Sequence, residues 1–412
     1  PTSAMGAVDG LMLRAGAVVA PRVPRIVMPL VIRRVKSETH GIVLPSDDPK
    51  FGRHLATRSD DGVRLNINPL GEAILSDAEA DARLATVLAK IDRADVDYVS
   101  VKVSSIVANL DVLADDHTIE RVAARLRTLF RAAAVSTPQT FVNLDMEEFR
   151  DRDLTIDAFT LVLSDPEFVV LDAGIVLQAY LPDSHDAGER LGSWAVERRR
   201  AGGGRIKIRL VKGANLAMEA VEAELHGWVA APYGDKADVD ASYKKLLDSL
   251  LRPKWADAIR VGVASHNLFD VAWALVRTRA MGATDRVQFE MLEGMAPAQA
   301  RAVQALAERE GLAQLLLYSP VVADEDFDAS IAYLSRRLDG MRERRSQMVE
   351  PRVTVPKELL NGDAEEKTFD LEGIEIWNLT EAFAKLLEET GGASELTFDV
   401  AKKTVDHYAG QI

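Results

Sequence analysis

The sequence has no cysteine among its 412 residues. A disulfide bond, a thiolate metal site and a cysteine nucleophile are therefore all excluded. The sequence also lacks a His-Glu-x-x-His pair, a tight cluster of histidine and aspartate, and the strand-turn-helix serine motif of hydrolases. We therefore expect neither a metal centre nor nucleophilic catalysis by a serine.

Long apolar runs and an excess of positive charge are missing as well. No run approaches the ~20 apolar residues of a transmembrane helix, and Leu11–Ala20 is interrupted by Arg14 and lacks a signal-peptide pattern. The formal net charge is −14, which disfavours nonspecific binding of the whole surface to nucleic acid or anionic lipid. We expect a cytoplasmic protein without a nucleic-acid partner. Residues 1–40 are locally basic, so a peripheral contact at the inner face of the membrane stays open.

From Gly62 onward, short β-rich runs alternate with runs of helical periodicity. The candidate strands are Val63–Asn68, Tyr98–Ser104, Thr140–Asp145, Gly174–Tyr180, Ile206–Lys212, Ile259–Ser265, Arg286–Met291 and Gln314–Tyr318. The helical runs include Asp77–Arg93, Thr118–Ala134, Leu154–Leu163, Asp240–Leu251, Leu268–Met281 and Ala296–Arg309. Strands that alternate with helices predict a parallel sheet. Units of this kind over residues 62–338 match the about 250 residues of a (β/α)8 barrel.

An open, doubly wound sheet is the alternative arrangement. It usually carries a glycine-rich dinucleotide-binding turn after its first strand, whereas the first candidate strand here leads into Pro69-Leu-Gly-Glu72. We therefore expect an α/β protein with a (β/α)8 TIM-type barrel over residues 62–340. Residues 1–61 are expected to form an N-terminal arm, and residues 341–412 a linker followed by a helical C-terminal appendage.

The stretch from Arg205 to Asn215 is central to the expected barrel. It alternates basic and apolar residues, ends in Lys212-Gly213, and leads into a helical run that begins at Leu216. A lysine at the carboxyl end of a strand, followed by the N–H groups of a helix start, is suited to holding an anion. Taken alone, this segment is explained somewhat better by an ordinary strand-turn-helix with a solvated lysine.

Polar residues follow nearly every candidate strand. Because barrel active sites lie at the carboxyl ends of the strands, these residues are site candidates as a group: Asn68, Glu72, Lys102, Asp145, Glu147, Gln178, Tyr180, Lys212, His266, Asn267, Glu290, Glu293 and Tyr318. His266 alone is as consistent with a structural histidine. A helical run after the last strand carries Tyr333, Arg336 and Arg337, and two guanidinium groups suit the capture of a carboxylate.

Nine short motifs, in this order along the chain, carry a family resemblance. They are Leu70-Gly-Glu-Ala73, Val101-Lys-Val-Ser104, Asn143-Leu-Asp145, Gln178-Ala-Tyr180, Arg209-Leu-Val-Lys-Gly-Ala214, Ser265-His-Asn267, Glu290-Met-Leu-Glu-Gly-Met295, Tyr318-Ser-Pro320 and Tyr333-Leu-Ser-Arg-Arg337. Together they make residues 20–339 similar to the proline dehydrogenase family, in the form found at the front of bifunctional proline-utilisation enzymes.

The resemblance implies an FAD-dependent oxidation of L-proline to Δ1-pyrroline-5-carboxylate by hydride transfer to the flavin, the first step of proline catabolism. It further implies an electron acceptor, expected to be a quinone, and leaves a homo-oligomer open. The catalytic residues that it implies are Lys102, Asp145, Tyr318, Tyr333, Arg336 and Arg337. Asn68, Glu72 and Leu292 would form the substrate pocket and its gate, in which Glu72 pairs with Arg336. The implied cofactor-binding residues are Gln178, Arg209, Lys212, Gly213, Ala214, His266, Asn267 and Glu290.

The sequence departs from the family at three places. Asn68 stands where many members have an aspartate, Asn215 where many have an aromatic residue, and Gly340-Met341 where the family usually supplies Glu-Asn. Two alternatives stay open: a barrel flavoenzyme for another small amine or a pterin, and a non-catalytic barrel used as an assembly module, which only the altered end of the last helix supports. In the second, the partner would be an amphipathic helix of the tail built from Leu379, Phe383, Leu386 and Leu387. The aldehyde dehydrogenase of bifunctional members is not expected, since it needs several hundred more residues and a cysteine.

Overall fold

The structure is a computed structural model. It describes residues 42–70, 74, 76–110, 115–146, 148–323, 330, 352–355 and 367–370. The predicted residues Glu72, Glu147, Tyr333, Arg336 and Arg337, and the predicted helix of the tail, lie outside these ranges.

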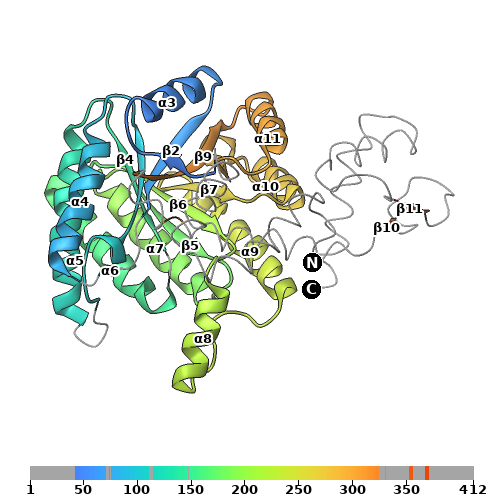
Figure 1. Ribbon diagram of the computed structural model, residues 1–412. Helices are drawn as coiled ribbons and strands as arrows, with labels where there is room; N and C mark the ends of the chain where they lie inside the picture. The colour runs from blue at the N-terminus through green and yellow to red at the C-terminus, as the bar shows by residue number, and fades with distance from the viewer. Residues whose placement is uncertain are drawn as a thin grey trace, which may run out of the picture.

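Eight parallel strands form a closed barrel (Figure 1). They are β2 (Arg64–Pro69), β3 (Tyr98–Lys102), β4 (Phe141–Asp145), β5 (Ala173–Gln178), β6 (Ile206–Val211), β7 (Ile259–Ala264), β8 (Val287–Leu292) and β9 (Ala313–Val322). The barrel closes because β9 pairs with β8 on one side and with β2 on the other. The predicted (β/α)8 barrel is confirmed, and the doubly wound sheet is excluded.

Helices follow the strands. They are α4 (Asp77–Ile91), α5 (Asp115–Val135), α6 (Arg152–Leu163), α7 (Ser184–Arg200), α8 (Leu216–His226), α9 (Lys236–Leu250), α10 (Leu268–Ala280) and α11 (Pro297–Arg309). In Figure 1 these helices lie around the barrel except for α8, which projects away from it. One continuous apolar core fills the space between helices and strands, and it includes Leu126 of α5 and Phe159 of α6. This layer stabilises the barrel and fixes the strand ends on which the site is built.

Two elements precede the predicted start of the barrel at residue 62. Strand β1 (Leu44–Pro45) pairs in parallel with Val321 and Val322, beyond the point where the pairing of β8 with β9 ends. Helix α3 (Lys50–Asp60) buries Phe51 and Leu55. Its Arg58 guanidinium donates to Glu293 Oε1 at 2.7 Å, so the helix is tied to the loop after β8.

The last strand is longer than the sequence indicated, because β9 continues from Tyr318 to Val322. The predicted strand ended at Tyr318, yet Ser319 and Pro320 both pair in register with β2. A second difference lies in the predicted linker and tail, where β10 (Arg352–Val355) pairs antiparallel with β11 (Lys367–Asp370). Among the described residues, no helix has the length and apolar character needed to cross a membrane.

Candidate active site

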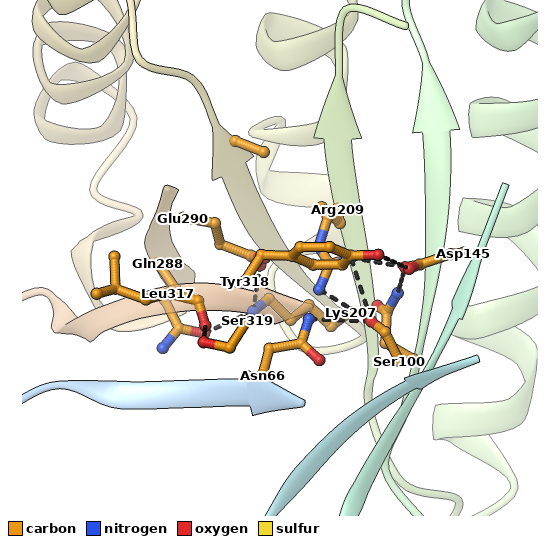
Figure 2. A network of polar contacts seen from close by, with 12 residues as sticks. Asn66, Ser100, Asp145, Lys207, Arg209, Gln288, Glu290, Leu317, Tyr318 and Ser319 are labelled. Carbon is orange, nitrogen blue, oxygen red and sulfur yellow. Dashed lines mark hydrogen bonds and ion pairs between the residues drawn. The ribbon is translucent and has the colours of Figure 1, made fainter. Parts of the chain in front are cut away.

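The middle of β6 directs two basic side chains into the interior of the barrel. Ile206, Ile208 and Leu210 belong to the apolar core. The alternate residues Lys207 and Arg209 contact side chains on strands that are not neighbours of β6, so they cross the barrel interior (Figure 2). We call this interior the lumen. Both basic residues are 4% exposed, and buried cations of this kind require partners.

Arg209 is bound by carboxylates from two sides. Its Nε donates to Glu290 Oε2 of β8 at 2.6 Å, and its Nη1 donates to Asp145 Oδ1 of β4 at 2.7 Å. Ser100 Oγ lies 3.4 Å from both Nη atoms. These contacts fix the guanidinium plane near the carboxyl ends of the strands.

Tyr318 joins this network at the rim of the lumen. Its hydroxyl donates to Asp145 Oδ2 at 2.8 Å and accepts a hydrogen bond from the Asn68 amide. The Arg209 guanidinium carbon lies 5.4 Å from the centre of the Tyr318 ring, which is within the range of a cation–π contact. Five of the predicted residues, contributed by five strands, are thus in one connected group: Asn68, Asp145, Arg209, Glu290 and Tyr318.

Lys207 belongs to the same network but was not predicted from the sequence. Its Nζ lies 2.5 Å from Glu290 Oε1 and 2.5 Å from Gln288 Oε1. Glu290 therefore bridges the two cations of β6 with its two oxygens. The available signal was the spacing: two basic residues at i and i+2 share one face of a strand, and both faces of a barrel strand are buried.

The protonation states follow from burial and charge together. Burial lowers the pKa of Lys207 to about 8, although Glu290 acts against this shift. Burial alone would also lower the pKa of Arg209, but Glu290 and Asp145 raise it above its ordinary value. For Glu290, burial favours the neutral acid, and the charges of Arg209 and Lys207 outweigh it, so its pKa lies below the usual range. At neutral pH the lumen therefore holds a charged Lys207–Glu290–Arg209 triad.

A glycine on β7 makes room for the triad. A Cβ atom on Gly262 would collide with the Glu290 carboxylate and would lie 2.9 Å from Lys207 Cε. Any larger residue there would displace one member of the ion pair. The small residue and the long charged side chains are thus complementary in volume, as close packing requires.

Lys212 marks the end of β6 and is paired rather than solvated. Its Nζ lies 2.8 Å from Asp270 Oδ2 and 2.5 Å from Asp240 Oδ1. Burial would lower the pKa of Lys212, but these two carboxylates raise it, so the side chain stays charged. Gly213 follows with φ +136°, a conformation that favours glycine, and a Cβ atom there would collide with the Tyr180 ring. The exposed backbone of Gly213 and Ala214 can therefore be approached closely beside a fixed cation.

The other predicted cofactor residues lie on neighbouring strand ends. Gln178 donates from Nε2 to the Met146 carbonyl at 3.4 Å. His266 Nε2 accepts from the Leu292 backbone N–H at 2.8 Å, which couples the loop after β7 to the end of β8. Asn267 Oδ1 accepts from Phe269 N at 2.9 Å and caps helix α10.

Lys102 and Leu292 complete the described part of the predicted site. Lys102 pairs in register with Asp145, and Leu292 pairs in register with Tyr318. Both therefore stand at the same rim as the ion network.

The arrangement fits a flavin. Positive charge fixed at Arg209 and Lys212 suits a cofactor that gains negative charge on reduction or carries phosphate groups. The open backbone at Gly213 suits close contact with a flat or phosphorylated group. The described side chains that the resemblance implied for cofactor and substrate lie at one end of the barrel.

A family model described as proline dehydrogenase matches residues 51–349. Proline utilization A from Corynebacterium freiburgense is 44% identical with a TM-score of 0.70, over 81% of this chain and 34% of that chain. Proline utilization A from Bdellovibrio bacteriovorus, in a form inactivated by N-propargylglycine, is 29% identical with a TM-score of 0.65, over 72% of this chain and 32% of that chain. This chain thus spans about a third of the length of either protein. No curated protein matches it.

Proposed function

The chain belongs to the proline dehydrogenase family, and on that premise we propose that it oxidises L-proline to Δ1-pyrroline-5-carboxylate in a flavin-dependent reaction. The observation that carries the proposal is the contact of Asp145, Arg209 and Tyr318 at the barrel rim. The resemblance assigned these residues separately to substrate and cofactor. Their direct hydrogen bonds support one shared site.

We infer that the cofactor is FAD. When bound, the flavin supplies the acceptor for the hydride. Arg209, Lys212, Gly213, Ala214 and Gln178 would hold it, together with His266, Asn267 and Glu290. The contribution of the two cations is electrostatic, because a positive charge that is already oriented favours the negative charge of the reduced cofactor.

We infer that proline binds against Tyr318. The Tyr318 ring is held by hydrogen bonds to Asn68 and Asp145, so it presents a rigid wall to a small saturated ring. Arg336 and Arg337 would bind the substrate carboxylate, with Lys102 nearby, and Tyr333 and Leu292 would complete the pocket. The reaction removes a hydride from the ring carbon next to nitrogen and a proton from the nitrogen, which leaves the C=N bond of the product.

We also propose an electron acceptor, a gate over the site, a cellular location and an oligomeric state. The electrons would pass to a quinone, and Glu72 would pair with Arg336 to close the site over proline. The family assignment also supports a cytoplasmic protein, with at most peripheral membrane contact and with homo-oligomers open to test.

Anaerobic spectroscopy tests the proposal. The purified protein, reconstituted with FAD where necessary, should show flavin absorbance that L-proline bleaches. Other small cyclic amines and a reduced pterin serve as controls for the alternative flavoenzymes. A bound flavin that saturating proline leaves fully oxidised would contradict the proposed reaction, and bleaching by a pterin alone would redirect it.

A further inference from the structure

Lys207 lies one layer deeper in the lumen than Arg209 and pairs with Glu290. Resting on the proposed function, we propose that Lys207 is a positioning residue of the flavin site. Through Glu290 it sets the net charge beneath the flavin, and with it the reduction potential of the bound cofactor.

Glu290 connects Lys207 to the cofactor-facing cation. One carboxylate oxygen accepts from Lys207 and the other accepts from Arg209, at 2.5 and 2.6 Å. Glu290 is 2% exposed. Lys207 precedes Arg209 by two residues on the same strand, so it lies one layer further from the carboxyl end. The charge of Lys207 therefore acts on Arg209 through one carboxylate that both side chains share.

The charges of the four linked residues Lys207, Arg209, Glu290 and Asp145 cancel only when Lys207 is protonated. The two cations Lys207 and Arg209 face the two carboxyl groups of Glu290 and Asp145. Loss of the lysine charge leaves Arg209 shared between two carboxylates and gives the buried group one net negative charge. Burial weakens solvent screening, and a negative charge near the flavin disfavours its reduction.

The surroundings of Lys207 come from four strands. Glu290 and Gln288 of β8 accept from it, and Arg209 of β6 is the adjacent cation. The Tyr98 ring of β3 lies 5.2 Å from its Nζ, and the Arg64 charge of β2 acts to lower its pKa. Burial raises the pKa of Tyr98, so its hydroxyl stays neutral. Within this cluster of charged residues, Lys207 loses its proton at mildly alkaline pH, near its pKa of about 8.

Potentials measured without proline test the proposal. We would determine the flavin midpoint potential of the FAD-loaded wild type, Lys207→Met, Glu290→Gln and the double variant by spectroelectrochemistry. Lys207→Met should make flavin reduction about tenfold less favourable, the size of one uncompensated charge at an effective protein dielectric constant of about 20. Tenfold corresponds to about 30 mV for a two-electron couple. Glu290→Gln should shift the potential in the opposite direction. The double variant should return close to the wild type, because it removes both charges.

Two control variants separate the effect of the lost charge from that of an altered structure. Lys254→Met removes a surface cation that pairs with Glu189 and should leave the potential unchanged. Lys207→Gln keeps a hydrogen-bonding group without the charge and should shift the potential in the same direction as Lys207→Met. It also provides the measurement if the methionine variant fails to fold.

The pH profile provides a second readout. The difference in potential between the wild type and Lys207→Met should shrink above pH about 8, because the wild type then loses the same charge. A difference that is absent at pH 7, or a double variant displaced as far as Lys207→Met, would overturn the proposal while proline bleaching and the proposed function stand. A flavin that shows the shifts but is never bleached by proline would contradict the proposed function alone.

Discussion

The two faces of the barrel strands bury opposite kinds of side chain. On β6, Ile206, Ile208 and Leu210 pack into the apolar layer under the helices, and each is at most 1% exposed. The alternate residues Lys207 and Arg209 are 4% exposed and are surrounded by carboxyl groups and hydrogen-bond acceptors. Side chains of the outer layer need only apolar area and a matching volume. The charged side chains of the lumen also need ion-pair and hydrogen-bond partners. Both faces thus contribute to stability, the outer layer through apolar burial and the lumen through buried ion pairs, and the proposed site residues belong to the lumen.

The largest expected effect comes from breaking the lumen at its centre. Arg209→Met would leave Glu290 and Asp145 without their shared cation, and removing one partner of a buried ion pair costs about 3–5 kcal/mol of unfolding free energy. The variant should also lose flavin affinity. Urea unfolding and flavin titration measure the two effects. Normal stability with normal flavin binding would show that the network is not the centre of the site.

The matched change in the outer layer is Ile208→Ala, one residue earlier on the strand. It creates a cavity in the apolar core and should cost about 2–5 kcal/mol. Because Ile208 faces away from the lumen, the flavin spectrum and the proline dependence of bleaching should stay as in the wild type wherever the variant is folded. A shifted flavin spectrum in this variant would argue against the separation of the two faces.

A smaller effect is expected from the rim. Tyr318→Phe removes the hydroxyl that donates to Asp145 and accepts from Asn68. Hydrogen bonds to charged groups contribute about 1.5–3 kcal/mol, so proline affinity should fall as the ring loses its fixed position. Flavin content should change little. Stopped-flow bleaching at varied proline concentration measures the effect. An unaltered half-saturating proline concentration would show that Tyr318 does not line the proline pocket.

Per pH unit, the pH dependence of stability gives the smallest effect. The pKa of Lys207 falls from its ordinary 10.5 in the unfolded chain to about 8 in the folded one. Between these values the unfolded state binds a proton that the native state does not, so stability rises with pH across this window. The slope for this group is at most about 1.4 kcal/mol per pH unit.

The comparison with Lys207→Met isolates that contribution. The unfolding free energy of the wild type relative to the variant should increase from pH 8 toward pH 10.5, because the other titrating groups are common to both proteins. A difference that stays constant over this range would show that Lys207 does not titrate as the lumen geometry indicates.

Local patterns in the sequence were sufficient to predict the barrel. Runs such as Ile206–Val211 are short, β-branched and bounded by glycine, and the strands lie within a few residues of their predicted positions. The end of β9 could not be predicted, because Pro320 breaks a local pattern and only pairing with β2 extends the strand. Helix α3 is another case, since contacts with distant residues such as Glu293 hold it on the barrel.

The contacts within the site were harder to predict than its members. Arg209 and Glu290 are 81 positions apart in sequence, and their contact depends on the register of strands that are not neighbours. Lys207 was missed because alternating basic and apolar residues also describe a strand with one solvated face. Knowing that both faces are buried would have identified it.

A crystal structure of the FAD-loaded protein with a carboxylate analogue of proline that cannot be oxidised tests the central claim most directly. We predict that the flavin ring lies across the carboxyl ends of the strands, in contact with Arg209 and Lys212. The analogue should lie against Tyr318, with its carboxylate bound by Arg336 and Arg337. A flavin bound away from the lumen, or an analogue carboxylate held by other residues, would contradict the account.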